Sequence, residues 1–149
     1  MTFKEKVYQQ YLQIIKDKIL SLETILNDLN ESAKNETKST AGDKHETALA
    51  MLQIEQENTR KKIAETIEQK TQLERINIHQ KSDTIIKGSL IKTDKGSLLL
   101  SIALGKIVID EITITALSPQ SPLGIKLLGL KMNDMVEINN NQFLIKDIL

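Results

Sequence analysis

A heptad repeat of apolar residues near the start of the chain constrains the fold more than any other feature of the sequence. Seven residues follow one another at alternating intervals of four and three positions, the pattern of a helix that buries one stripe against a partner helix. These residues are Tyr8, Leu12, Ile15, Ile19, Leu22, Leu26 and Leu29. The stripe gives way to a polar stretch over residues 30–42, where we expect a loop. The pattern therefore predicts one long amphipathic helix ending in this stretch.

A second, weaker helical pattern follows from Asp43 to about His79. The residues at roughly helical spacing are Leu49, Leu52, Thr59, Ile63, Ile67, Leu73 and Ile76. Gly42 is the only glycine before residue 88, and no proline occurs before residue 119. The two patterns therefore predict two helices of about 30 residues, each about 45 Å long. We expect these helices to form an antiparallel coiled-coil hairpin over residues 1–80 with its tip near 36–46. An intermolecular coiled coil through the same stripe is the alternative, and the two forms of pairing are compatible.

After residue 82 the sequence changes to short runs typical of β-strands. The expected strands cover residues 84–91, 97–102, 106–109, 112–117, 135–138 and 142–148. Asp94-Lys95-Gly96 and Asn139-Asn140-Asn141 supply residues suited to hairpin turns. Ser121 as N-cap, Pro122 at the first helical position and Gly129 as the stop predict one short helix. The fold class is therefore expected to be α+β, with a small sheet domain over residues 83–149.

The composition excludes several classes of protein. The chain has no cysteine, which rules out disulfides and thiolate metal sites, and its 20 basic residues balance 20 acidic ones. A net charge of zero disfavours binding to nucleic acid by bulk electrostatics. No apolar run approaches the roughly 20 residues that cross a bilayer, and the start of the chain lacks the pattern of a secretory signal. We expect a cytoplasmic protein that does not bind membranes.

The only group of residues suited to chemistry is an acidic pair at the expected tip. No nucleotide-binding or serine-hydrolase motif is present, and Leu49 stands where a zinc-protease helix would place its second histidine. Asp43 and Glu46 are three residues apart, so they project from the same side of a helical turn. One interpretation is a capping box at the helix start. The other is a pair of carboxylates for Mg²⁺ that binds the metal weakly until a second macromolecule completes the site.

Two segments of the chain match the sequence motifs of one known protein family. Residues 42–46 match the G-D-x-x-E part of the family's tip pattern G-D-x-x-E-N, and Thr47 replaces the usual Asn. In the second part of the chain, Ser121–Gly124, Leu127–Gly129, Lys131 and Asp134–Val136 look like the family's S-P-[IL]-[GA]-x-x-L-[LI]-G-K-x-x-x-D-x-V stretch. With these motifs the chain resembles the Gre-type transcript cleavage factors of bacterial RNA polymerase. The resemblance spans the chain, and it implies an N-terminal coiled-coil hairpin followed by an FKBP-like C-terminal domain.

The resemblance also implies a function and a set of site residues. The protein would not be an enzyme by itself: its hairpin would enter the secondary channel of RNA polymerase and stimulate cleavage of backtracked RNA. Asp43 and Glu46 would serve as catalytic and metal-binding residues, holding Mg²⁺ shared with the polymerase near the nascent RNA 3′ end. Residues Gln120, Ser121 and Pro122 would dock on the polymerase. Lys34, Lys38 and Lys44 would contact RNA phosphates, the alternative being that they are simply solvated.

Departures from the family pattern keep two alternatives open. Thr47, Leu49 and Ala50 stand where family members often have Asn, Glu and Tyr, and Gln120 replaces a frequent acid before the Ser-Pro pair. Factors of this architecture include some that enter the channel and regulate or inhibit the polymerase without stimulating cleavage. A coiled-coil adaptor that does not bind polymerase is the third class. Prolyl isomerase activity is disfavoured, because Phe143 is the only aromatic residue of the second domain.

Overall fold

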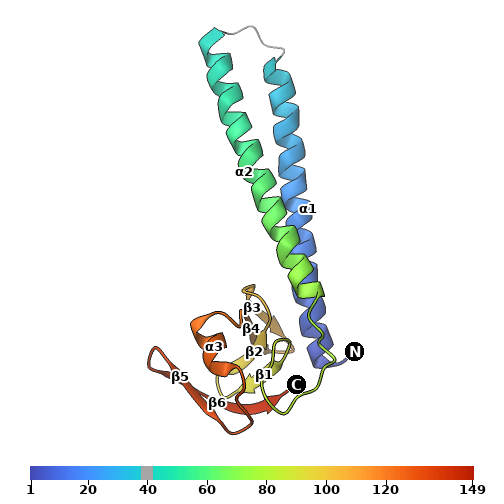
Figure 1. Cartoon of the computed structure of the whole chain (residues 1–149). Helices are drawn as coiled ribbons and strands as arrows, with labels where there is room; N and C mark the ends of the chain where they lie inside the picture. Colours follow the sequence, from blue (N-terminus) through green and yellow to red (C-terminus); the bar gives the residue numbers. More distant parts are fainter. Residues whose placement is uncertain (38–41) are drawn as a thin grey trace. The chain divides into compact units, whose positions relative to one another are not determined.

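The computed structural model describes the backbone of residues 1–37 and 42–149, and the side chains of residues 1–36 and 46–149. The chain forms two compact units, one made of Met1–Leu12 with Gln72–Leu149 and the other of Gln13–Thr71. Helices α1 (Phe3–Thr37) and α2 (Gly42–Glu74) contribute residues to both units (Figure 1). The predicted α+β class is confirmed, because these two long helices precede a mixed sheet and one short helix.

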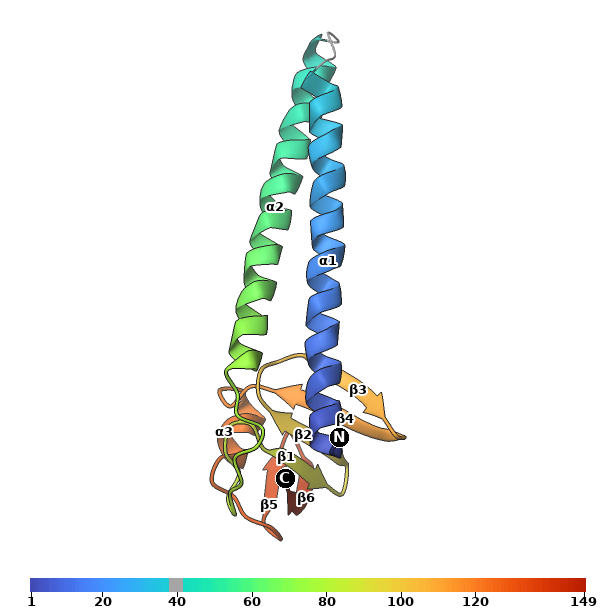
Figure 2. The same ribbon diagram turned by 90° about the vertical axis from the view of Figure 1, so that its right-hand side faces the viewer.

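In the unit Gln13–Thr71, α1 and α2 run side by side in opposite directions (Figures 1 and 2). The Nε2 atom of Gln56 on α2 donates a hydrogen bond to Oδ1 of Asn30 on α1 at 2.9 Å. Ile15 is buried, and the later members of the predicted α1 stripe, up to Leu29, are half-buried. The stripe of α1 therefore packs within this one chain, as the hairpin interpretation requires.

The inner face of α2 is more polar than the face that the sequence predicts. Buried or half-buried positions recur with heptad spacing at Leu49, Leu52, Gln56, Thr59, Ile63 and Thr66. The hydroxyl of Thr59 donates to the Glu55 carbonyl at 2.8 Å, and that of Thr66 donates to the Lys62 carbonyl at 2.7 Å. The prediction that Ile67 belongs to the stripe is wrong, because its side chain is 47% exposed. Thr66 takes the inner position because its hydroxyl is satisfied by its own helix.

Within the described residues, six strands form one sheet in the order β3-β4-β2-β1-β6-β5. The strands are β1 (Leu90–Thr93), β2 (Gly96–Leu100), β3 (Gly105–Ile109), β4 (Ile112–Leu117), β5 (Met135–Ile138) and β6 (Asn141–Ile148). Strands β2 and β4 are parallel, and the other neighbours are antiparallel. The sheet is therefore mixed, with β6 inserted between β1 and β5.

The first predicted strand is largely wrong. Of residues 84–91, only Leu90 and Ile91 belong to a strand, and Thr84 forms an isolated bridge with Lys131. The chain turns at Gly88, whose φ of +98° is one that side-chain-bearing residues rarely adopt. A Cβ at this position would also lie 2.9 Å from Cγ2 of Ile76. Periodicity alone did not separate this irregular segment from a strand.

The predicted turns and the short helix are present. Asn139 and Asn140 have φ values of 51° and 65° and connect β5 to β6. Helix α3 (Pro122–Leu127) begins after Ser121, whose Oγ accepts a hydrogen bond from the Gly124 amide at 3.0 Å. Leu127 is fully buried in the core cluster of the sheet, which also contains the buried residues Ile85, Ile91, Leu98, Leu100, Leu117, Val136 and Ile145.

The sheet is covered on its second face by the start of α1. Successive residues Leu90 and Ile91 are both buried, although adjacent side chains of a strand point to opposite faces. Only Ile91 of this pair belongs to the core cluster beside α3. On α1, Tyr11 is fully buried, and its hydroxyl reaches carbonyl oxygens of β3 and β4. The compact unit therefore has helical cover on both faces, where the sequence predicted only the short helix.

Candidate functional site

The predicted acidic pair lies in the first turns of α2, next to the reversal of the helical pair. Because α2 begins at Gly42, Asp43 and Glu46 are three positions apart on one helix, as expected. The side chain of Glu46 is exposed. The side chain of Asp43 lies outside the described residues, as does that of Lys44. The structure thus places the Glu46 carboxylate in solvent at the start of α2.

The lysines predicted to contact RNA are only partly described. Lys34 lies in the last turn of α1, and its Nζ is 3.8 Å from Oε1 of Glu31 with both side chains 71% exposed. An exposed pair of this kind holds its lysine weakly, so the ammonium can exchange its partner for another anion. Lys38 lies outside the described residues. At the end of α1 the structure therefore places one exposed cationic side chain.

The donor atoms of the acidic pair are of the kind that binds a hard divalent cation. Carboxylate oxygens are the ligands that Mg²⁺ prefers, and Mg²⁺ is commonly held by one or two protein carboxylates and ligands from other molecules. Among the residues that the structure describes, no group of three or more acidic or histidine side chains could hold a metal. Two carboxylates at a helix start are a donor set that fits a Mg²⁺ ion shared with ligands from another molecule.

The predicted docking segment precedes α3, and its three residues have different environments. Gln120 and Pro122 are exposed. The hydroxyl of Ser121 donates to the Ser118 carbonyl at 2.6 Å while it accepts from the Gly124 amide, so its hydrogen-bonding capacity is used inside the turn. Ser121 therefore shapes the segment, and the surface available to a partner belongs to the residues on either side of it.

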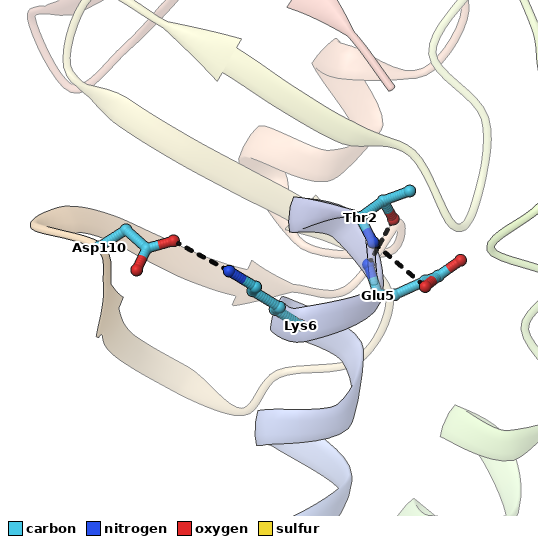
Figure 3. A network of polar contacts seen from close by, with 4 residues as sticks. All are labelled: Thr2, Glu5, Lys6 and Asp110. Atoms are coloured by element: carbon cyan, nitrogen blue, oxygen red, sulfur yellow. Dashed lines mark hydrogen bonds and ion pairs between the residues drawn. The ribbon is translucent and has the colours of Figure 1, made fainter.

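The start of α1 carries two polar contacts that were not predicted from the sequence. Thr2 and Glu5 form a reciprocal capping box, in which the Glu5 amide donates to the Thr2 hydroxyl at 3.1 Å and the Thr2 amide donates to the Glu5 carboxylate at 3.2 Å (Figure 3). The T-x-x-E spacing could have revealed it. Lys6 on the same turn pairs with Asp110 of the β3–β4 turn at 3.6 Å, a contact between segments too distant for sequence patterns to show.

Comparisons with known proteins find similarity to a solved structure but none to a family model or a curated protein. A solved structure described as that of the transcription factor Gfh1 is 18% identical, with 96% of this chain and 91% of that chain covered and a TM-score of 0.34. A likeness at this score carries no argument about function. In the part of the chain that the structure describes, no helix is both long enough and apolar enough to span a bilayer.

Proposed function

We propose that this protein is an accessory factor of RNA polymerase that stimulates the cleavage of backtracked RNA. The observation that carries the proposal is the exposed carboxylate of Glu46 at the reversal of a long antiparallel helical pair, three residues after Asp43. A pair of helices is narrow, so it can carry an acidic group into a channel that a globular domain cannot enter. The Gre-like residues at 42–46 and at 121–136 support the same function.

In this proposal the chain contributes two carboxylates, and the polymerase contributes the catalytic centre. Asp43 and Glu46 would hold a Mg²⁺ ion jointly with polymerase residues and orient the water that attacks the RNA phosphodiester. The metal would supply charge neutralisation and an activated water. Metal binding by this pair would require both carboxylates in the ionised form. Lys34, together with Lys38 and Lys44, would stay close to the RNA phosphates.

Docking on the polymerase would use the surface next to α3. Gln120 and Pro122 would contact the partner directly, whereas Ser121 would maintain the turn that presents them. An exchange of Gln120 should therefore change the affinity for polymerase without changing the stability of the fold.

The decisive experiment is an RNA cleavage assay on stalled polymerase complexes with the full chain. We expect RNA shortening by the unmodified protein and a loss of at least about tenfold in the cleavage rate for Asp43→Asn and for Glu46→Gln, since each removes a metal ligand. Both variants should still compete for polymerase as well as the unmodified protein. Glu57→Gln, an exposed acid farther along α2, is the matched control and should cleave normally.

Two other results would assign a different function. Polymerase binding without any RNA shortening would make the protein a secondary-channel regulator, a class favoured by Thr47, which is exposed beside Glu46 and replaces the family's Asn. If the protein did not bind polymerase, the proposal would be contradicted, and the protein would be assigned to the coiled-coil adaptors.

A further inference from the structure

The hydrogen bond between Asn30 and Gln56 divides the helical pair into two stretches. Because α1 and α2 run in opposite directions, the residues that follow Asn30 lie opposite those that precede Gln56 (Figures 1 and 2). The distal stretch comprises residues 31–36 and 46–55, and the proximal stretch comprises residues 13–29 and 57–71. Both belong to the same compact unit, so they can be compared directly.

The proximal stretch has a well-covered inner face. Ile15 and Thr66 are each 2% exposed, and Thr59 is 6% exposed. The half-buried apolar residues of this stretch are Ile19, Leu22, Leu26, Leu29 and Ile63. Burial of apolar surface is the main force that holds two helices together, and here it is supplied on both helices along the whole stretch.

The distal stretch has much less to bury. The structure describes all of its side chains, and none of them is buried. Its half-buried residues are Ala33, Glu36, Ala48, Leu49 and Leu52. The stripe of α1 therefore continues beyond Leu29 with a small side chain and a charged one. Two leucines that face these residues gain little from apolar burial, so little opposes their separation from α1.

The helices of the distal stretch also need this contact to persist. Isolated helices shorter than about 12–15 residues are marginal in water, and residues 31–36 are far shorter. Ser32 and Asn35 have low helix propensity. A polar pair at an inner position, such as Asn30 with Gln56, fixes the register of two helices. Separation beyond this pair therefore leaves the register of the proximal stretch unchanged.

We propose that the distal stretch is a device that opens locally, its two helices separating and re-pairing while the proximal stretch stays packed. The hydrogen bond between Asn30 and Gln56 marks the limit of this opening. Opening carries the exposed carboxylate of Glu46 away from α1, so the start of α2 samples a range of positions. The device is a property of the chain itself and does not depend on the function proposed above.

The test is amide hydrogen exchange of the full chain, followed by NMR and compared with the rates of an unstructured peptide. Residues 49–55 should show protection factors at least about tenfold lower than residues 60–66 of the same helix. Their exchange should depend little on added urea, because local opening exposes little surface. Equal protection of the two groups would overturn the proposal. Exchange of residues 49–55 with the urea dependence of global unfolding would also overturn it.

Enlarging the small inner side chain of α1 tests the cause of the opening. Ala33→Leu should slow the exchange of residues 49–55 by about threefold to tenfold, because it adds apolar burial opposite α2. Ser32→Leu, at an exposed position of the same turn, is the matched control and should leave this exchange unchanged. Both effects are read on α2, so a change in the helix propensity of α1 does not explain a difference between them. Circular dichroism checks that Ala33→Leu is folded, and unchanged exchange in the folded variant would contradict the proposal.

Discussion

The hydroxyl oxygen of Tyr11 lies 2.7 Å from the carbonyl oxygen of Gly105, and the carbonyl oxygen of Ile114 is 3.1 Å away. Tyr11 is fully buried, and these bonds connect residues separated by more than ninety positions in the chain. A hydrogen bond from a buried hydroxyl contributes to stability, so the phenol does more than fill space. It attaches the first turns of α1 to the β3–β4 pair.

Replacement of Tyr11 by Phe should therefore destabilise the protein. The ring stays buried but its hydrogen bonds are lost, and we expect a decrease of about 1–2 kcal/mol in the free energy of unfolding measured in urea. Tyr8→Phe is the matched control, because the Tyr8 hydroxyl makes a single longer bond, 3.3 Å to the Leu73 carbonyl. Equal stability of the two variants would show that the Tyr11 hydroxyl contributes nothing specific.

The same side chain should make stability depend on alkaline pH. Burial raises the pKa of Tyr11 to about 12 from its ordinary value of 10.0, although the backbone amide of Ala116 acts in the opposite direction. The stabilisation that comes from the neutral phenol is fully present below about pH 10 and is lost as the pH rises toward about 12. The difference between the two pKa values corresponds to a loss of about 3 kcal/mol.

This alkaline loss can be isolated by measuring unfolding of the unmodified chain and of Tyr11→Phe between pH 8 and about 12. Lysines also titrate in this range, and they affect both proteins alike. The stability advantage of the unmodified chain should therefore shrink as the pH rises and change sign as the pH approaches about 12, because the expected loss exceeds the advantage of about 1–2 kcal/mol. A difference that stays constant over this range would disprove the raised pKa.

Gly124 should not tolerate a side chain. A Cβ at this position would overlap the carbonyl oxygen of Ser118, and it would also approach the Cα of Pro119 to 2.9 Å. Both obstacles are backbone atoms, which cannot move away cheaply. Gly124→Ala should lower the free energy of unfolding by about 1–3 kcal/mol, as overpacked sites do.

The control for this exchange is Gly129→Ala, where a Cβ would meet nothing within 4 Å but the φ of +84° is strained. It should cost about 1 kcal/mol from backbone strain alone. A Gly124→Ala protein as stable as the unmodified chain would mean that the turn before α3 can open by more than the structure suggests.

The hydrogen bond between Asn30 and Gln56 gives a test of the helical pair. Asn30→Leu or Gln56→Leu alone leaves one amide of the pair without its partner and should lower stability by about 1 kcal/mol. The double variant replaces both polar groups with an apolar contact and should be at least as stable as the unmodified protein. Additive losses in the double variant would contradict the contact, and a double-mutant cycle by thermal unfolding measures the difference.

The sequence predicts best those features that depend on local chemistry. The heptad stripe of α1 identifies a helix with a partner, and Ser121, Pro122 and Gly129 define the short helix because capping depends on a few adjacent residues. Asn139 and Asn140 reveal their turn for the same reason. The turn at Asp110 and Glu111 was not predicted to have positive φ values, because glutamate rarely adopts them.

Features that need distant segments could not be predicted. Tyr11 differs little in sequence context from Tyr8, yet only Tyr11 is fully buried, because the sheet approaches one side of the first turns of α1. Only 8% of Lys4 is exposed, and the pocket beside it is lined by residues 78–83 and 148–149, which are far from it in the sequence. At the tip, spacing predicted that Asp43 and Glu46 share one helix, but spacing cannot decide between a helix cap and a metal ligand.

The position of β6 bears on how the protein forms during synthesis. This strand follows all the others in sequence, yet it pairs with β1 on one side and with β5 on the other. Residues 13–71 can pair as helices soon after they leave the ribosome, whereas β1 keeps an open edge until residues 141–148 emerge. A ribosome that pauses before that point therefore holds a nascent chain in which one edge of β1 is unpaired. Chaperones bind such edges, and pairing with another chain through such an edge leads to aggregation.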